Sequence, residues 1–254
     1  MIPARMASSR FPGKPLEPLL GLALVLHVYE RCKQCPDLDR VIIATCDEEI
    51  RIACEEHGAE VVMTADSHPG CVDRTDEAIS IAASDMDDTD LVLMVQGDEI
   101  LVDPEMLSNI VNAYSKTGAP VVNLASRIFD QTNHNDPDVV KVVGAPDGKA
   151  LYFSRAPIPS HHRVDDMATV PVYQQTGIIG FSKQFVHQFG KMAQTPLEIV
   201  ERIDMMRVIE NGLPVQLVYS EKETIGVDTP ADKARAEQIL RSDPVTKTHM
   251  KDMV

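Results

Sequence analysis

Short runs of β-branched and other apolar residues alternate along this chain with longer segments of helical period. Val41–Thr45 (VIIAT) and Leu91–Val95 (LVLMV) are two such runs, and neither contains a charged residue. Strands that are apolar almost throughout must be covered on both faces, and helices between them supply that cover. The pattern therefore predicts an α/β fold with a mixed, mostly parallel sheet and helices on both faces.

The same pattern places the individual elements. Strands are predicted at residues 41–45, 60–63, 91–95, 120–125, 139–143, 150–153, 176–181, 215–219 and 225–227. Helices are predicted near 24–34, 48–57, 74–84, 104–116, 183–192, 197–211 and 231–241. The denser strands between 120 and 181 predict a smaller mixed or antiparallel insertion. Only Met1 and Ile2 precede Pro3, so a strand at the start would be unusually short.

The chain of 254 residues contains no long linker rich in proline, glycine or serine. We therefore expect a single domain over residues 1–241, with residues 120–195 as a subregion, and a flexible tail at 242–254. Residues 161–172 are polar and irregular, which predicts a surface loop. The longest uncharged apolar run, Leu19–Leu26, is too short to span a bilayer, and no signal peptide opens the chain. These features favour a cytoplasmic protein without membrane insertion.

Charge is unevenly distributed. The net charge is −15, which makes nucleic acid and anionic lipid poor partners. Yet the first fourteen residues hold Arg5, Arg10 and Lys14 and no acid. This basic segment in an acidic chain predicts a small anionic ligand. The five cysteines are odd in number and scattered, and Cys32-x-x-Cys35 lacks a second ligand pair for zinc, so we expect free thiols.

The segment from Ala4 to Lys14 (ARMASSRFPGK) has the composition of a phosphate-binding loop. Its small residues allow the backbone N–H groups to approach an anion, and Arg10 and Lys14 add positive charge. Such cations would stabilise charge developing on a leaving pyrophosphate. The order of residues is not that of a Walker A loop. By spacing alone, a basic surface turn remains the alternative.

Two aspartates follow predicted strands. Asp98 comes after the run 91–95 and Gln96-Gly97, and Asp228 comes after Ile225–Val227. Ligands of open α/β sheets bind at the carboxyl ends of strands, where two carboxylates can share Mg²⁺. Thr229 and Pro230 can begin the next helix, leaving Asp228 to face the crevice. A turn carboxylate at Asp98 and a helix cap at Asp228 remain the alternatives from spacing alone.

Several ordered motifs carry a closer resemblance. They are IPARMASSRFPGKPL at 2–16, HVYER at 27–31, ATCDEEI at 44–50, VQGDE at 95–99, VVKVV at 139–143, ALYFSRAPIP at 150–159, RVIENG at 207–212 and GVDTPADKARAE at 226–237. Together they resemble the CMP-Kdo synthetases, which are 3-deoxy-manno-octulosonate cytidylyltransferases. The resemblance implies a Rossmann-like nucleotidyltransferase fold of the glycosyltransferase-A-like kind. It also implies transfer of CMP from CTP to the anomeric hydroxyl of an acidic 3-deoxy sugar, with release of pyrophosphate, for lipopolysaccharide or capsule synthesis.

The resemblance also assigns roles by position. The residues that match nucleotide-binding positions are Ala4, Arg5, Ser9, Arg10, Lys14, Arg74 and Gln96. The catalytic set is Arg10, Lys14, Asp98 and Asp228, in which Asp98 and Asp228 hold the Mg²⁺ cofactor. The expected sugar-binding residues are Gln96, Arg155, Gln175, Glu201 and Asp204. The family is commonly dimeric, so we expect a homodimer formed through the subregion at 120–195.

The sequence departs from the family mainly on the sugar side. The usual His-x-Gly-Ile-Tyr segment is Gln175–Ile179 here, and the usual Leu-Glu-Gln-Leu-Arg segment is Ile203–Arg207 (IDMMR). A pocket with altered polar partners discriminates against the original sugar. The acceptor is therefore either Kdo, with neutral drift in these segments, or a modified or different acidic sugar such as an aminated one. A catalytically inactive nucleotide-binding paralogue is the remaining alternative.

Overall fold

The computed structural model of the protein describes residues 1–7, 11–160 and 170–251. Three parallel strands near the start of the chain form one sheet in the order β1 (Ile2–Ala4), β4 (Ile42–Thr45) and β5 (Glu60–Met63). The predicted strands at 41–45 and 60–63 are thus confirmed, and the strand at the start is short, as expected. The ranges 8–10, 161–169 and 252–254, including most of the predicted loop at 161–172, lie outside the described residues.

The larger sheet is mixed. It contains β6 (Leu91–Val95), β7 (Val121–Ile128), β8 (Lys141–Gly144), β9 (Ala150–Ser154), β10 (Val172–Ser182) and β11 (Val215–Ser220). β10 is central: it pairs antiparallel with β6, β7 and β8, while β11 lies parallel to β7. The antiparallel pairing of β8 with β9 forms the predicted insertion.

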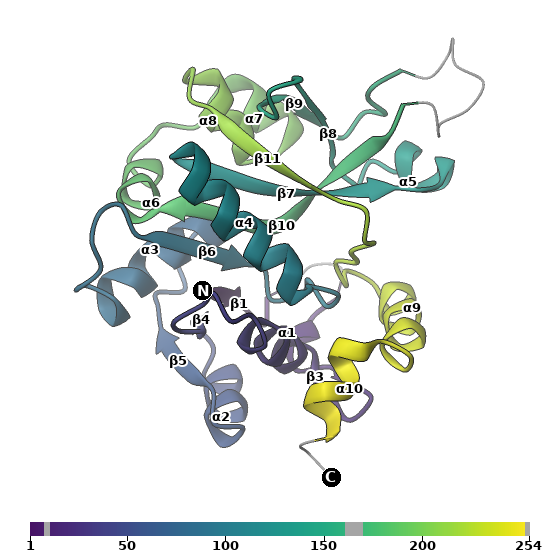
Figure 1. The fold of residues 1–254 in the computed structure, drawn as a ribbon. Helices are drawn as coiled ribbons and strands as arrows, with labels where there is room; N and C mark the ends of the chain where they lie inside the picture. Colours follow the sequence, from purple (N-terminus) through teal and green to yellow (C-terminus); the bar gives the residue numbers. More distant parts are fainter. Residues whose placement is uncertain (8–10, 161–169, 252–254) are drawn as a thin grey trace.

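Backbone hydrogen bonds connect the two sheets between β1 and β6. Met1 N donates to Leu93 O at 2.8 Å, Val95 N donates to Met1 O at 2.9 Å, and Gly97 N donates to Pro3 O at 3.2 Å. The spacing is that of parallel neighbours. β5, β4, β1, β6, β7 and β11 therefore run in one direction and β10 runs against them, which confirms the mixed, mostly parallel sheet (Figure 1).

Helices cover both faces. The longer ones are α1 (Leu24–Lys33), α2 (Glu48–Glu56), α3 (Cys71–Ala82), α4 (Pro104–Thr117) and α9 (Pro230–Leu240). One apolar core joins α1, α4 and α9 to the sheet, and a second joins α3 with α6 (Lys183–Phe189) and α8 (Met205–Glu210). The short elements are η1 (Lys14–Leu16), β2 (Pro18–Leu19), β3 (Leu22–Ala23), α5 (Gln131–Asn135) and α7 (Pro196–Glu201). Among the described residues, no helix is long and apolar enough to cross a membrane.

Two predictions of secondary structure are wrong. The single helix expected at 197–211 is two helices, α7 and α8, because Arg202 adopts a left-handed conformation with φ 56° and ends α7. The strand expected at 225–227 is absent from the described structure. Gly226 makes only an isolated bridge to Glu99, so the segment has no continuous ladder of hydrogen bonds.

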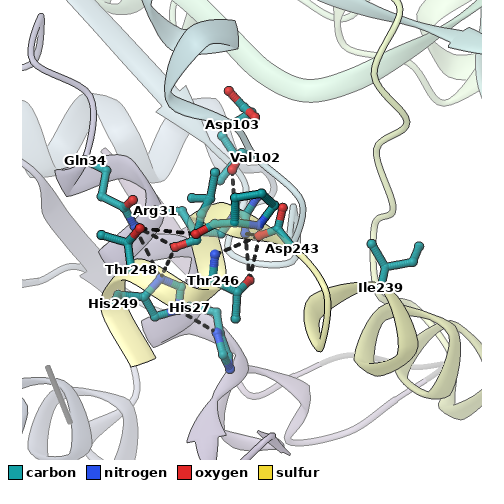
Figure 2. Close-up of polar contacts among 12 residues, drawn as sticks. His27, Arg31, Gln34, Val102, Asp103, Ile239, Asp243, Thr246, Thr248 and His249 are labelled. Carbon is teal, nitrogen blue, oxygen red and sulfur yellow. Dashed lines mark hydrogen bonds and ion pairs between the residues drawn. The ribbon is translucent and has the colours of Figure 1, made fainter. Parts of the chain in front are cut away.

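The end of the chain also differs from expectation. Part of the tail predicted to be flexible forms helix α10 (Pro244–Lys251), which packs on α1. Buried Arg31 of α1 donates from Nη1 to Asp243 Oδ2 at 2.5 Å and to Thr246 Oγ1 at 2.9 Å, and from Nε to Val102 O at 2.6 Å. Figure 2 shows these contacts converging on one guanidinium. Polar bonds of this kind, rather than a long apolar stripe, hold the segment in place.

Candidate active site

The N-terminal loop brings Lys14 to the carboxyl ends of β1 and β6. The loop closes through a hydrogen bond from Gly13 N to Met6 O at 3.1 Å, and Gly13 has φ 76°, which a residue with a side chain rarely adopts. Met6 N donates to Asp47 Oδ2 at 2.7 Å, which fixes the outer side of the loop. Lys14 then begins η1 with its side chain largely buried.

Asp98 lies on a tight turn after β6. Gly97 of this turn packs directly on β1, since an added Cβ would lie 3.1 Å from Pro3 O. Ile100 N donates to Asp98 O at 2.8 Å, and Val227 N donates to the same oxygen at 3.1 Å. The backbone of Asp98 is therefore bonded to the segment that carries Asp228.

Asp228 lies two residues before the start of α9 and does not cap the helix. The cap is Thr229, whose Oγ1 accepts from Asp232 N at 3.2 Å, while Asp232 Oδ2 accepts from Thr229 N at 2.8 Å. This reciprocal capping box leaves the Asp228 side chain to face the crevice. The predicted cap at Thr229 is confirmed.

Lys14 joins the two carboxylates. Its Nζ donates to Asp228 Oδ1 at 2.8 Å and also forms a short ion pair with Asp98. Burial opposes the charge on Lys14, but the Asp98 and Asp228 carboxylates outweigh it and raise the pKa of the ammonium group. Lys14 is therefore a permanent cation at this site.

The donor set fits a magnesium ion. Two carboxylates from separate segments already converge on one cationic atom, and hard oxygen ligands are those that Mg²⁺ prefers. Within the described ranges, no group of three or more His, Cys, Asp or Glu side chains has metal-binding geometry. Asp98 and Asp228 could thus supply only part of a coordination shell, as expected where substrate phosphates and water supply the rest.

A cavity of about 400 Å³ lies beside this centre. Gln96, Gln175, Asp98 and Asp228 all line it, so the structure brings these four predicted site residues together. Its other acidic lining residues, which the sequence analysis did not single out, are Glu99, Asp136, Asp138, Glu223 and Asp232. Glu99 and Asp232 had a sequence signal, because they lie within the VQGDE motif and the GVDTPADKARAE motif.

Glu99 is buried next to Asp98. Burial, and then the nearby Asp98 charge, raise the pKa of Glu99 to about 7. Its Oε1 accepts from Gly177 N, and Oε2 has no hydrogen-bond partner in the described part of the chain. The cavity is therefore lined, between β6 and β10, by a carboxyl group that gains a proton near neutral pH.

The remaining sugar-side residues lie elsewhere. Arg155 and Glu201 contact each other at the end of β9 and do not line the cavity, but Arg155 Nη1 donates to the backbone oxygen of Pro137, which lies between the lining residues Asp136 and Asp138. Asp204 is exposed beside the start of α3, where a Cβ added at Gly70 would lie 3.7 Å from its Oδ2. Of the five predicted sugar-binding residues, only Gln96 and Gln175 line the cavity, while Arg155 with Glu201, and Asp204, form two separate groups.

The nucleotide-side residues are placed only in part. Ala4 is buried at the end of β1 and Arg5 is exposed, while Ser9 and Arg10 lie outside the described residues. Arg74 is buried in α3, where Nη1 bonds Thr64 Oγ1 and donates to Ala65 O at 3.2 Å. A contact between Arg74 and the base stays a prediction.

Comparison with known proteins shows which enzymes this chain resembles. The family model described as "Cytidylyltransferase" matches residues 1–225. A 3-deoxy-manno-octulosonate cytidylyltransferase of Syntrophotalea carbinolica is 41% identical over 249 residues, covering 95% of this chain and 97% of that protein. An 8-amino-3,8-dideoxy-manno-octulosonate cytidylyltransferase of Shewanella frigidimarina is 37% identical over 245 residues, covering 96% and 98%.

Solved structures of nucleotidyltransferases share the fold of this chain. A CMP:2-keto-3-deoxy-manno-octonic acid synthetase complexed with CTP superposes with a TM-score of 0.84 at 28% identity, covering 94% of this chain and 96% of the other. A glucose-1-phosphate thymidylyltransferase from Bacillus anthracis superposes with a TM-score of 0.67 at 16% identity, covering 95% and 94%, and so shares the fold. The crevice at Lys14 therefore lies in a nucleotidyltransferase fold.

Proposed function

This chain belongs to the CMP-Kdo synthetase family of cytidylyltransferases and is a nucleotidyltransferase, and we propose that it transfers CMP from CTP to the anomeric hydroxyl of a 3-deoxy-ulosonic acid. The observation that carries the proposal is the ion pairing of Lys14 with both Asp98 and Asp228 at the carboxyl edge of the sheet. The product would supply lipopolysaccharide or capsule synthesis, and the need for CTP favours a cytoplasmic location.

The reaction is a single displacement. The sugar hydroxyl oxygen forms a bond to the α-phosphorus as the bond from that phosphorus to the bridging oxygen breaks; the hydroxyl proton is lost to water, and pyrophosphate leaves with the bonding electrons. Lys14 neutralises charge on the triphosphate, and we assign Arg10 and Arg5 of the same loop to the nucleotide. Asp98 and Asp228 would hold Mg²⁺, which when bound supplies positive charge to the phosphate and sugar oxygens. Gln96 and Gln175 would orient the sugar in the adjoining cavity.

A pyrophosphate-release assay tests this function. Purified protein is given Mg²⁺, Kdo and one of the four ribonucleoside triphosphates, and the product is identified by mass spectrometry. We expect a CMP-sugar from CTP alone. An inactive paralogue would instead bind CTP in calorimetry and release no pyrophosphate with any acid sugar.

The charge of the cavity bears on the acceptor. Its lining contains many carboxylates, and the guanidinium of Arg235 in the same lining is paired with Glu223. A lining rich in carboxylates attracts a sugar that carries an ammonium group more strongly than a sugar that carries a hydroxyl group at the same position. We therefore favour an aminated 3-deoxy-ulosonate over Kdo. Comparing kcat/KM for Kdo and for 8-amino-3,8-dideoxy-manno-octulosonate decides between them, and equal values would contradict selection by charge.

We also infer a homodimer. Strand β9 in the predicted subregion and helix α7 just beyond it expose apolar side chains: Leu151 is 59% exposed, Ile199 59% and Val200 77%. Large apolar side chains left exposed to this extent are typical of a surface that a second chain covers. Light scattering on Val200→Glu should report a monomer, whereas Ile81→Glu on α3, also exposed, should leave the dimer intact. A wild-type monomer would contradict this inference.

A further inference from the structure

The Glu201 carboxylate is fully engaged by the end of strand β9. Glu201 is the last residue of α7, and its Oε1 accepts from Ser154 Oγ at 2.8 Å and from Tyr152 Oη at 3.2 Å. Its Oε2 accepts from the backbone N–H of Arg155 at 2.9 Å. Both oxygens are therefore committed within the protein.

The Arg155 guanidinium is held along one edge. Nε donates to the backbone oxygen of Glu201 at 2.8 Å, and Nη1 donates to the backbone oxygen of Pro137 at 2.9 Å. Two fixed nitrogens determine the plane of a guanidinium. No acceptor for Nη2 is found among the residues that the structure describes.

A buried lysine strengthens this arrangement. Lys141 Nζ donates to Arg155 O at 2.7 Å and also bonds the backbone oxygens of Asp136 and Val139 at 2.6 and 2.5 Å. Lys141 and Arg155 thus lie close together, with the Glu201 and Asp136 carboxylates near them. Because the Glu201 oxygens are bonded inside the protein, the Nη2 edge of Arg155 can take an anionic ligand.

We propose that Glu201 is a positioning residue that holds Arg155 with its Nη2 edge directed to the carboxylate of the acceptor sugar, and is not itself a sugar ligand. This inference rests on the proposed function. An arginine that is ordered before binding loses less side-chain entropy when the sugar arrives. Glu201 thereby contributes to the affinity for an acid sugar without contacting it.

Glu201→Gln tests the role directly. The amide retains one acceptor oxygen for β9 but loses the other, so the hydrogen bond that fixes the Arg155 backbone is weakened and the base of its side chain is less well held. We expect the KM and calorimetric Kd for the acid sugar to rise about tenfold, as for loss of one charged hydrogen bond, with kcat and the KM for CTP within about twofold of wild type. Glu201→Asp, which retracts the charge by one methylene, should show the same split.

Glu210→Gln is the matched control. The Glu210 carboxylate accepts from Leu197 N and Glu198 N at 3.1–3.2 Å, so it supports the opposite end of α7 without contacting Arg155. We expect it to leave the sugar KM unchanged even where it lowers the melting temperature. An equal rise in the sugar KM for both variants would reduce Glu201 to a structural role and overturn the inference.

A double-mutant cycle separates positioning from an independent contact. In an Arg155→Lys background, Glu201→Gln should change the sugar KM by less than about twofold, because residues that act as a unit are not additive. Full additivity would overturn the inference. A wild-type protein that binds CTP but neither binds nor activates any 3-deoxy-ulosonate would instead overturn the proposed function itself.

Discussion

Lys14 Nζ lies 2.8 Å from Asp228 Oδ1, although the two residues are 214 positions apart in the chain. The ion pair connects the first loop to the segment before α9, and Asp98 shares the same ammonium group. Lys14→Met should therefore lower kcat/KM for CTP by about 100-fold, the scale seen when one donor to a developing anion is removed. Pyrophosphate release at varied CTP measures it, with Lys149→Met, an exposed lysine paired with Asp147, as the control. Equal activity of the two variants would contradict a role for Lys14.

The two carboxylates predict a dependence on magnesium. Chelation with EDTA should abolish pyrophosphate release, and added Mg²⁺ should restore it, because Asp98 and Asp228 supply the oxygen ligands that this ion prefers. Asp228→Asn should also weaken the Mg²⁺-dependent rise in melting temperature measured with CTP. Asp232→Glu keeps a carboxylate in the capping box next to Asp228 and serves as the control. Undiminished activity in EDTA would exclude this use of Asp98 and Asp228.

The sequence predicted what depends on local pattern. The strands at 42–45, 60–63 and 91–95, the loop to Lys14 and the turn to Asp98 follow from apolar runs and small residues close in sequence. The segment before Asp228 looked like a strand because it is apolar. It forms one bridge, to Glu99, and pairing with a remote partner is invisible in a local pattern.

Residues whose roles depend on distant polar contacts were not predictable. Arg74 matches a base-side motif, yet its guanidinium bonds Thr64 and Ala65 inside the fold. Glu201 matched a sugar position, but its partners at the end of β9 are 46 to 49 residues away. The sequence predicts a flexible tail at 242–254, because the residue that fixes α10 is Arg31, which lies 212 positions before Asp243. Apolar periodicity carries no information about such pairs.

The pairing of Arg31 with Asp243 predicts a large effect on stability. Arg31→Met would leave the mostly buried Asp243 carboxylate without its cation, and such a change costs about 3–5 kcal/mol. Urea unfolding should show the loss. The double variant Arg31→Met with Asp243→Asn should recover part of it, because no buried charge then lacks a partner. Strictly additive losses would show that the ion pair is not what holds α10.

The pairing of His27 with His249 predicts acid sensitivity (Figure 2). His27 Nε2 donates to Leu19 O at 2.8 Å, and its Nδ1 lies 3.1 Å from His249 Nε2. Burial lowers the pKa of His27 from 6.5 to about 4, and it lowers the pKa of His249 as well. Nearby Arg31 further opposes protonation of both rings, while Glu30 and Asp243 favour it at His249.

The direction of the pH effect follows from proton uptake. Between about pH 6.5 and pH 4 the unfolded chain binds a proton at His27 that the folded protein excludes. The contribution of His27 to stability is therefore complete above pH 6.5 and is lost as the pH falls through this range, by roughly 3 kcal/mol in total. Glu99, whose pKa is raised to about 7, contributes the opposite slope, so wild type alone is not informative.

Comparison with His27→Gln isolates the histidine contribution. Glutamine can still donate to Leu19 O and accept from His249, but it does not titrate. Urea unfolding at pH 7.5, 6 and 5 should show a smaller loss of free energy of unfolding on acidification than in wild type. Thr248→Ala on the exposed side of α10 should retain the wild-type slope, since its hydroxyl bonds only Pro244 O of the same helix. Parallel pH dependence for His27→Gln and wild type would show that the buried ring is not the acid-sensitive group.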